Sequence, residues 1–247
     1  MNQMNVWGMT DIGLVRKENQ DAYVTAQHTA SGRTVGVVCD GMGGPAGGRV
    51  ASQIAVSVYL EELEKLLTAD QTPQQLLEAS AQAAALANQA IQAEAERREE
   101  CRNMGTTLVS AISYDGGVVV TNVGDSRAYH ITEDGITRIT KDHSLVESMV
   151  DRGDITAEEA RRHPSRNLIT RALGAEPVLL ADCFDQNVAP GDYLLLCSDG
   201  LSNVVTDQEI LYEVIHGGED EACCQRLLDV ALHRGAPDNV TVVLMRC

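Results

Sequence analysis

The chain has 247 residues, 44% of them hydrophobic, so it can bury a full core at a length that one large domain often reaches. Its 19 Lys and Arg residues stand against 36 Asp and Glu residues, which gives a net charge of −17. That charge argues against nucleic acid or an anionic membrane as a partner held by bulk electrostatics.

Residues 1–10 lack the basic start and the apolar stretch of a secretory signal, so none is expected there. No apolar run approaches the ~18 residues that span a bilayer. The seven cysteines include an adjacent pair at 223–224 and no CxxC pair, which is typical of reduced thiols. We therefore expect a cytoplasmic protein without membrane insertion.

Strand-like and helical segments alternate along the chain, and no linker or repeat marks a domain boundary within 1–247. Runs of β-branched and apolar residues predict seven strands, at 34–39, 106–113, 118–123, 128–132, 178–184, 192–197 and 241–245. The first of these strands ends directly before an Asp-Gly pair, and the sixth ends one residue before another. Asp40 and Asp199 are therefore expected in turns at strand ends.

Helical periodicity predicts two pairs of helices. The first pair covers 51–66 and a segment after Thr72-Pro73-Gln74-Gln75, which supplies an N-cap, a first-turn proline and a capping-box glutamine. The second pair begins at the capping box 206–209 and continues over 221–233. Strands in hairpin-like runs with paired helices between them favour an α+β fold, with an antiparallel sheet core covered by helices.

Four short acidic segments look like the separated parts of one hard-metal site. They are Asn19-Gln20-Asp21, Asp40-Gly41-Met42-Gly43-Gly44, Ser198-Asp199-Gly200-Leu201 and Asp238-Asn239-Val240-Thr241. Carboxylates and backbone carbonyls suit Mg²⁺ or Mn²⁺, and two such ions side by side promote in-line attack on phosphorus. An isolated aspartate before glycine is usually a turn residue. The four segments together indicate hydrolysis of a phosphate ester.

The order of these and other motifs resembles the bacterial branch of the type 2C metal-dependent Ser/Thr protein phosphatases. The other motifs are Thr10-Asp11-x-Gly13-x-x-Arg16, Gly105-Thr106-Thr107, Val123-Gly124-Asp125-Ser126-Arg127 and Asp142-His143-Ser144. The resemblance covers nearly the whole chain. It implies one catalytic domain built as a four-layer αββα sandwich, two antiparallel β-sheets flanked by pairs of antiparallel helices. It also implies a flap subdomain at about 144–174 beside a metal cleft.

Two metal ions in the core of the site, Mn²⁺ or Mg²⁺, are implied by the same resemblance. Asp40 would bridge both ions and the carbonyl of Gly41 would bind one of them, while Asp199 and Asp238 hold the other. Asp21 would be an outer-shell group that orients metal-bound water. Paired ions lower the pKa of a shared water until hydroxide exists near neutral pH.

Substrate binding and a third, weaker ion are also implied. Asp125 would hold the third ion together with Asp199, and Arg16 would bind the substrate phosphate. A planar, permanently charged guanidinium suits this task better than lysine. The flap is the most densely basic part of the chain, with Arg161, Arg162, Arg166 and Arg171. These arginines either hold an anionic substrate or form a solvated helix face.

Two departures from the family pattern limit how far the residue roles can be transferred to this chain. Gln20 stands where many family members have glutamate, and Met42 stands where eukaryotic members have a histidine proposed as general acid. An oxygen-only site needs no histidine, so His143 and His163 are expected to form hydrogen bonds within the fold.

The sequence thus predicts a serine/threonine phosphoprotein phosphatase in which a bridging metal-bound hydroxide attacks, with Arg16, Asp40 and Asp199 in the catalytic set. Expected partners are phosphoserine and phosphothreonine proteins, including a Ser/Thr kinase, and the chain is expected to be a monomer. The alternatives are an inactive phosphoprotein-binding module, a small-molecule phosphatase and a metal-dependent nuclease. Intact Asp40, Asp199 and Asp238 count against the first, and the charge of −17 counts against the last.

Overall fold

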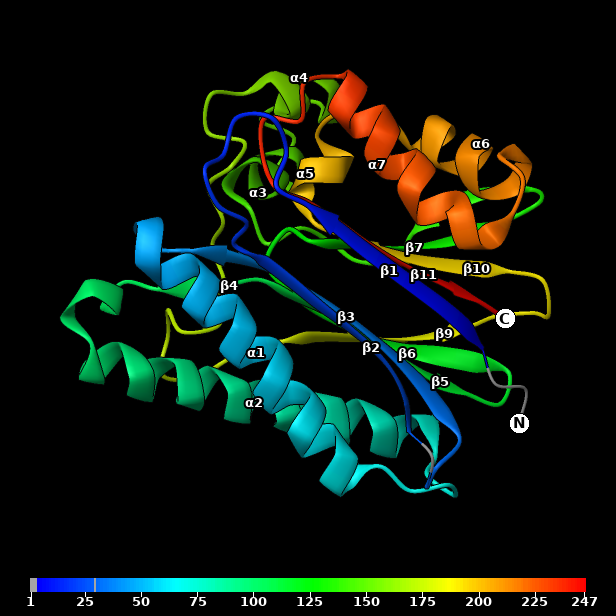
Figure 1. Cartoon of the computed structure of the whole chain (residues 1–247), viewed down its shortest axis with the longest axis horizontal. Coiled ribbons are helices and arrows are strands. Elements are labelled where there is room, and N and C mark those ends of the chain that lie inside the picture. Colours follow the sequence, from blue (N-terminus) through cyan, green and yellow to red (C-terminus); the bar gives the residue numbers. More distant parts are fainter. Residues whose placement is uncertain (1–3, 29) are drawn as a thin grey trace.

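Two antiparallel β-sheets stacked face to face form the centre of the computed structural model, which describes residues 4–28 and 30–247 (Figure 1). One sheet has the strand order β1-β11-β10-β7-β8, and the other has the order β2-β3-β5-β6-β9 with β4 paired to β3. The strands are β1 (Asn5–Asp11), β2 (Asp21–His28), β3 (Arg33–Met42), β4 (Gly105–Thr106), β5 (Leu108–Tyr114), β6 (Gly117–Val123), β7 (Arg127–Thr132), β8 (Gly135–Arg138), β9 (Asp182–Asn187), β10 (Tyr193–Cys197) and β11 (Val240–Arg246).

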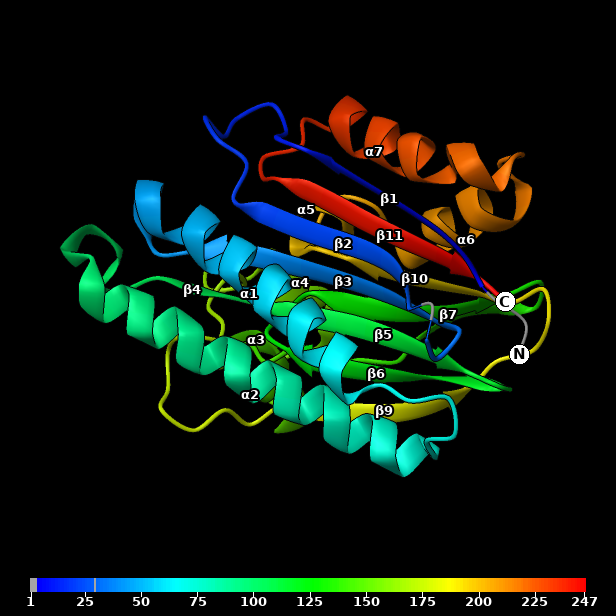
Figure 2. The ribbon, with the colours of Figure 1, turned by 60° about the horizontal axis from the view of Figure 1, so that its bottom comes forward.

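Helices cover both outer faces of the sandwich, as Figures 1 and 2 show. The long helices α1 (Gly44–Leu66) and α2 (Pro73–Arg97) pack on the sheet that contains β3. The shorter helices α6 (Asp207–His216) and α7 (Cys223–His233) pack on the sheet that contains β10. The remaining helical segments are α3 (Leu145–Asp151), α4 (Ala157–Arg162), α5 (Asp199–Ser202) and the 3₁₀ turns η1 (Glu99–Cys101) and η2 (Asp220–Ala222). The expected αββα architecture is confirmed.

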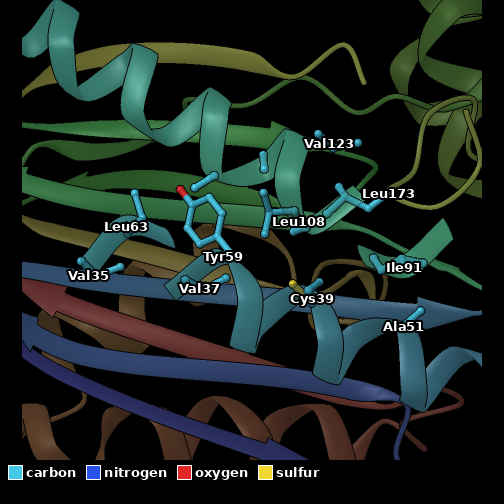
Figure 3. Packing of buried hydrophobic residues seen from close by; sticks show 14 of the residues in the cluster. Val35, Val37, Cys39, Ala51, Tyr59, Leu63, Ile91, Leu108, Val123 and Leu173 are labelled. Carbon is cyan, nitrogen blue, oxygen red and sulfur yellow. The ribbon is translucent and has the colours of Figure 1, made fainter. Parts of the chain in front are cut away.

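The alternation of side chains along the central strands explains the three apolar layers. On β10, Leu195 and Cys197 face α6 and α7, whereas Leu194 and Leu196 face the opposite sheet. On β3, Val35, Val37 and Cys39 face α1 and α2, where Figure 3 shows them beside Tyr59 and Leu63. A strand buried on both faces is apolar throughout, so its sequence shows a continuous apolar run.

The helices α2 and α6 begin at the capping boxes that the sequence predicts, whereas α1 begins at Gly44, seven residues before the predicted 51–66. At the start of α2, Thr72 Oγ1 accepts a hydrogen bond from the Gln75 N–H, and Gln75 Oε1 accepts one from the Thr72 N–H. The capping box at Thr206 and Glu209 likewise begins α6. Among the described residues, no helix combines the length and the apolar character that crossing a membrane requires.

Two strand predictions need correction. The predicted strand 106–113 is interrupted at Thr107, which leaves the ladder to bond with Asp40. The predicted strand 178–184 is wrong at its start, because β9 begins only at Asp182, where it pairs with β6. The strands β1, β2 and β8 were not predicted.

The acidic segments lie together at the edge of the sandwich where several strands end. β10 ends where its antiparallel neighbour β11 begins, so Asp199 and Asp238 come to the same edge. β3 reaches this edge at Asp40, which lies opposite Asp21 at the start of β2. β6 ends there too, at Val123, two residues before Asp125. The sheet topology therefore brings together carboxylates that are more than two hundred residues apart in the chain.

Candidate active site

A cleft of about 530 Å³ opens at the edge where these strands end. Six of the seven residues predicted to bind metal or substrate line this cleft: Arg16, Asp40, Gly41, Asp125, Asp199 and Asp238. The seventh, Asp21, is buried with 8% of its surface exposed. Asn167 and Ile169 of the predicted flap form part of the wall. The structure thus assembles the residues that the motifs indicated.

Asp40 is held by its main chain. The Asp40 N–H donates to Thr107 Oγ1 at 2.9 Å, and the Asp40 carbonyl accepts from the Thr107 N–H and the Thr106 hydroxyl, both at 2.9 Å. Asp40 was expected in a turn, but β3 continues through it to Met42. A strand backbone fixed at three points leaves only the side chain to respond to a ligand.

Gly41 lies where its backbone touches two other segments. A Cβ atom at Gly41 would stand 2.1 Å from the carbonyl oxygen of Gly48 and 2.6 Å from that of Gln20. No other residue type fits without moving α1 or the loop before β2. Close approach of backbone segments is what a site that uses a carbonyl ligand requires.

Asp21 has one satisfied and one unsatisfied oxygen. Its Oδ2 accepts hydrogen bonds from the Ser198 hydroxyl at 2.7 Å and the Thr241 hydroxyl at 2.6 Å. Its Oδ1 is buried and accepts no hydrogen bond from the described residues. Burial raises the pKa of Asp21 to about 7; the two hydroxyls oppose the rise, and the charges of Asp199 and Asp238 add to it.

Burial and mutual repulsion also raise the pKa values of the other carboxylates at the cleft. Burial and then repulsion from Asp21 and Asp199 raise the pKa of Asp40 well above its ordinary value. Burial and the charge of Asp199 raise the pKa of Asp125 in the same way. For Asp199 the pKa is raised by burial and by the charge of Asp238. Crowded carboxylates of this kind need either protons or cations.

The donor set fits a hard cation. The Oδ1 atoms of Asp21 and Asp199 are both buried without a hydrogen-bond partner among the described residues, and such atoms are rare unless an ion or water satisfies them. Within the same residues, no group of three or more His, Cys, Asp or Glu side chains is arranged to hold a metal ion. Mg²⁺ characteristically keeps several waters and takes only one or two protein carboxylates. An open carboxylate cleft therefore suits Mg²⁺ or Mn²⁺ better than Zn²⁺.

Arg16 lies on the loop between β1 and β2 and is paired with a predicted metal ligand. Its Nη2 donates to Asp238 Oδ2 at 2.6 Å, with 51% of the Arg16 side chain and 25% of the Asp238 side chain exposed. Asn239 shapes this loop, because its Nδ2 donates to the carbonyls of Ile12 and Glu18. The guanidinium is therefore held at the cleft with its charge accessible to solvent.

Asn239, Ser198 and Thr241 are supporting residues that the sequence reasoning left without a role. Asn239 Oδ1 also accepts from the Gln20 N–H at 2.8 Å, and the Ser198 hydroxyl accepts from the Thr241 N–H at 3.0 Å. All three stood inside the quoted motifs, next to an aspartate or three residues after one. A polar residue beside a predicted ligand is a signal for this kind of support.

The two departures from the family pattern both lie at the cleft. Gln20 and Met42 line it, and Gln20 Nε2 donates to Glu18 Oε1 and to the Gly44 carbonyl, each at 2.9 Å. A glutamate could not donate to these two oxygens. The amide thus supports the loop and the start of α1.

Asp125 sits in a turn that is fixed on its C-terminal side. The Ser126 hydroxyl is 2.7 Å from Thr107 Oγ1, which also bonds with Asp40. Arg127 forms a bidentate ion pair with Asp142, with contacts of 2.6 to 3.1 Å. The turn that carries Asp125 is thereby tied to the strand that carries Asp40.

The predicted flap, 144–174, contains α3 and α4 and borders a second hollow of about 330 Å³. This hollow shares Asp125 and Asp199 with the cleft, and Arg161 and Arg166 line its outer side. Arg171 behaves differently, because its Nη1 donates to Asp182 at 2.9 Å. The basic residues of the flap are thus divided between the hollow and the framework.

Comparison with known proteins identifies the family. A sequence profile described as "Protein phosphatase 2C" matches residues 15–227. The chain is 39% identical over 95% of its length to the serine/threonine protein phosphatase PstP of Mycobacterium tuberculosis, of which it spans only 43%. It is 36% identical to the serine/threonine phosphatase stp of Listeria innocua, with 96% of this chain and 93% of that protein covered.

A solved structure agrees with the sequence relatives. The catalytic domain of PstP in complex with two manganese ions superimposes with a TM-score of 0.85 at 35% identity, covering 98% of this chain and 97% of that domain. The chain therefore belongs to the protein phosphatase 2C family, among the bacterial serine/threonine phosphatases.

Proposed function

We propose that this chain is a metal-dependent phosphatase that removes phosphate from serine and threonine side chains of proteins. The observation that carries the proposal is the cleft itself, in which Asp40, Asp199 and Asp238 crowd together beside Arg16. A cluster of carboxylates with orphaned oxygens attracts cations, and an accessible guanidinium at the same opening attracts a phosphate dianion. The manganese complex of the related PstP catalytic domain supports this reading.

Each predicted ligand has a proposed place in a site for Mn²⁺ or Mg²⁺. Asp40 would bridge two ions, with the Gly41 carbonyl on one of them and Asp199 and Asp238 on the other. Asp125, in a turn shared with the second hollow, would bind a third and weaker ion together with Asp199. When bound, the ion pair supplies a hydroxide from a shared water, which is the nucleophile for in-line attack on phosphorus.

The chain's own residues then bind and orient the substrate. Arg16 exchanges its contact with Asp238 for the equatorial oxygens of the phosphate, whose charge it stabilises as the phosphoryl group is transferred. Asp21 lies behind the cleft with a pKa of about 7 and can hold a proton at Oδ1 near neutral pH. Asp21 thus acts on the site as an outer-shell group.

The proposed substrates are phosphoproteins, and a partner Ser/Thr kinase is proposed among them, with the chain acting as a monomer. We treat residues 1–247 as one catalytic domain with 144–174 as its flap, because Asn167 and Ile169 of that segment form part of the cleft wall. An inactive binding module and a small-molecule phosphatase are the competing functions. Two observations favour the protein phosphatase over both alternatives. The carboxylate set beside Arg16 is intact, and the match to the PstP catalytic domain covers 97% of that domain.

A substrate comparison tests the proposal. Phosphate release would be measured from phosphoserine, phosphothreonine and phosphotyrosine peptides and from small phosphate esters, with Mn²⁺ or Mg²⁺ present. We expect the phosphoserine and phosphothreonine peptides to be hydrolysed with the highest kcat/KM. Peptide binding without phosphate release would establish the binding module, and higher kcat/KM for a small ester would establish the small-molecule phosphatase.

A further inference from the structure

The Asp142-His143-Ser144 motif contains a histidine that the cleft does not use. Asp142 binds Arg127, and the Ser144 hydroxyl accepts the Glu147 N–H at the start of α3, so two members of the motif have clear structural partners. His143 lies between them, with 7% of its surface exposed. Its ring contacts neither phosphate-binding Arg16 nor any proposed metal ligand. The role of His143 in this motif is therefore still unexplained.

His143 binds both main-chain polar groups of Gly124. The Gly124 N–H donates to His143 Nδ1 at 3.1 Å, and the His143 N–H donates to the Gly124 carbonyl at 2.8 Å. An amide N–H can only donate, so Nδ1 carries no proton and the neutral ring holds its hydrogen at Nε2. We call this pair of bonds the Gly124 clamp.

The outer nitrogen of the same ring is also engaged. Its Nε2 lies 3.1 Å from Asp182 Oδ2 and 3.2 Å from Arg171 Nη1, and that Nη1 also donates to Asp182 Oδ1 at 2.9 Å. Burial alone would raise the pKa of Asp182, but the contacts with His143 and Arg171 outweigh it and hold that pKa below its ordinary value. Asp182 is therefore an ionised acceptor that selects the tautomer the clamp needs.

The main chain of His143 joins the clamp to the base of the flap. The Thr170 N–H donates to the His143 carbonyl at 2.7 Å, and Ser144 bridges to Ile169 in an antiparallel pair. Arg171, one residue further, is the partner of Asp182. The two ends of the flap thus meet at His143.

The clamp acts on the turn that carries Asp125. Gly124 has a φ of 107°, and a Cβ there would stand 2.6 Å from Thr107 Cγ2, so the turn is tightly packed in an unusual conformation. Asp125 follows directly, and its pKa is raised by burial and by the charges of Asp199 and Asp142. Ser126 and Arg127 hold the C-terminal side. On the N-terminal side the two bonds of the clamp, at 3.1 and 2.8 Å, are joined by one longer contact, from Asn122 Nδ2 to the Gly124 carbonyl at 3.4 Å.

We propose that His143 is a positioning residue: its clamp on Gly124 fixes the Asp125 turn at the cleft and links that turn to the base of the flap through Asp182 and Arg171. The clamp is a property of the fold. Its effect on metal binding and turnover rests on the proposed function, through the role given to Asp125.

The test compares four variants, His143→Ala, His143→Asn, Asp182→Ala and His130→Ala, with the wild type. The oxygen of asparagine can take the place of Nδ1 as acceptor for Gly124, although it cannot reach Asp182. His130 is the matched control, since its Nε2 also pairs with an aspartate, Asp192, at 2.7 Å. The readouts are amide hydrogen exchange at Gly124 by NMR without metal, and Mn²⁺ titration by calorimetry.

We expect Gly124 to exchange about tenfold faster in His143→Ala, because one hydrogen bond of ordinary strength is lost. His143→Asn should retain most of the protection, Asp182→Ala should lose part of it, and His130→Ala should leave it unchanged. The weakest Mn²⁺ step should move to higher concentration in His143→Ala, in the same direction as in Asp125→Ala.

Unchanged exchange at Gly124 in His143→Ala would overturn the proposal. An equal loss of protection in His143→Ala, His143→Asn and His130→Ala would also overturn it, since any buried ring would then serve. If His143→Ala does not fold, Asp182→Ala decides: faster exchange at Gly124 supports the clamp, and unchanged exchange overturns it. Because the exchange is measured without metal or substrate, it is independent of whether the chain is a phosphatase, which Asp125→Ala and the peptide assays test.

Discussion

Arg16 donates a hydrogen bond from Nη2 to Asp238 Oδ2 at 2.6 Å, so the proposed phosphate ligand is paired with a proposed metal ligand. Both side chains are partly exposed, and an ion pair of this kind contributes little to stability because water competes for both partners. The pair can therefore be exchanged for a cation on Asp238 and a phosphate on Arg16. With the proposed roles of Arg16 and Asp238, we expect substrate and metal binding to be linked at this contact.

Removing the Arg16 guanidinium should impair turnover of the substrate more than it affects metal binding. Arg16→Ala is expected to lower kcat/KM for a phosphopeptide by roughly 10- to 100-fold, the effect of one charged hydrogen-bonding group. Mn²⁺ affinity should stay equal or rise, because Asp238 loses a competing cation. Arg16→Lys should lie between, since a point charge cannot form the bidentate contact. Steady-state kinetics with calorimetric Mn²⁺ titration measures both effects.

The control for this series is Arg97→Ala, an arginine on α2 whose side chain is 76% exposed and only loosely paired with Glu94. It should match the wild type in kcat/KM and in Mn²⁺ affinity. If Arg16→Ala lost Mn²⁺ as severely as Asp40→Ala, or left the kinetics unchanged, the phosphate would have to be bound elsewhere, with the flap arginines as candidates.

Metal-free protein should become less stable as the pH rises from about 5 to about 7. Burial raises the pKa values of Asp21, Asp40, Asp125 and Asp199, that of Asp21 to about 7, whereas unfolded aspartate titrates near ~4. Between those values the folded state binds more protons than the unfolded state, so the free energy of unfolding falls with rising pH. Glu209, with a pKa lowered to about 2, contributes in the opposite sense only at lower pH.

Urea denaturation in chelator across this range measures the slope, and saturating Mn²⁺ should flatten it because cations replace the protons. Asp21→Asn should remove part of the slope in metal-free protein, since the amide does not titrate. A free energy of unfolding that rises steadily between pH 5 and 7 in chelator would show that these carboxylates are not stabilised as acids.

Gly200 provides a packing test of the site. A Cβ at this position would stand 1.9 Å from the carbonyl oxygen of Asn239, next to Asp238. Gly200→Ala should therefore destabilise the protein by about 1–3 kcal/mol, as overpacking does, and should weaken Mn²⁺ binding by displacing Asp238. Gly135→Ala is the matched control, with no atom within 4 Å of the added carbon. Thermal unfolding and Mn²⁺ calorimetry compare the two, and equal behaviour would refute the packing argument.

The strands that the sequence predicted well are those buried on both faces. β3, β6 and β10 contain runs of valine or leucine, and such a run predicts a strand even when the neighbouring strands are unknown. The missed strands β1, β2 and β8 all lie at sheet edges. An edge strand such as β2 buries less of its surface, carries polar residues, and depends on a ladder with one neighbour that no local pattern reveals.

The error at 178–184 has the same origin. Val178 and Leu180 made the segment strand-like, yet their surfaces are 76% and 65% exposed. The strand that forms, β9, begins four residues later with the polar sequence DCFDQN and lies at the edge beside β6. Its pairing with β6 decides its position, and the hydrophobic pattern does not.

The site residues also fall into those that local sequence reveals and those whose contacts only the structure reveals. Asp40 and Asp199 could be recognised because each follows an apolar run and precedes a glycine, a local pattern. The bonds from Ser198 and Thr241 to Asp21, the Arg16–Asp238 pair and the Gly124 clamp join segments far apart in the chain. Which loops meet is decided by the sheet order, so these contacts required the folded structure.

The central claim is that the cleft carboxylates hold the metal that makes this chain a phosphatase, and one measurement tests it most directly. Phosphate release from a phosphothreonine peptide would be followed over a range of Mn²⁺ concentrations for the wild type, Asp199→Ala and the exposed-turn control Asp134→Ala, with Mn²⁺ affinity from calorimetry. The wild type and the control should turn over only with metal and bind it equally, and Asp199→Ala should show no turnover at any concentration and weaker binding. Turnover that persists after exhaustive chelation, or a near-wild-type rate with unchanged Mn²⁺ affinity in Asp199→Ala, would contradict the claim.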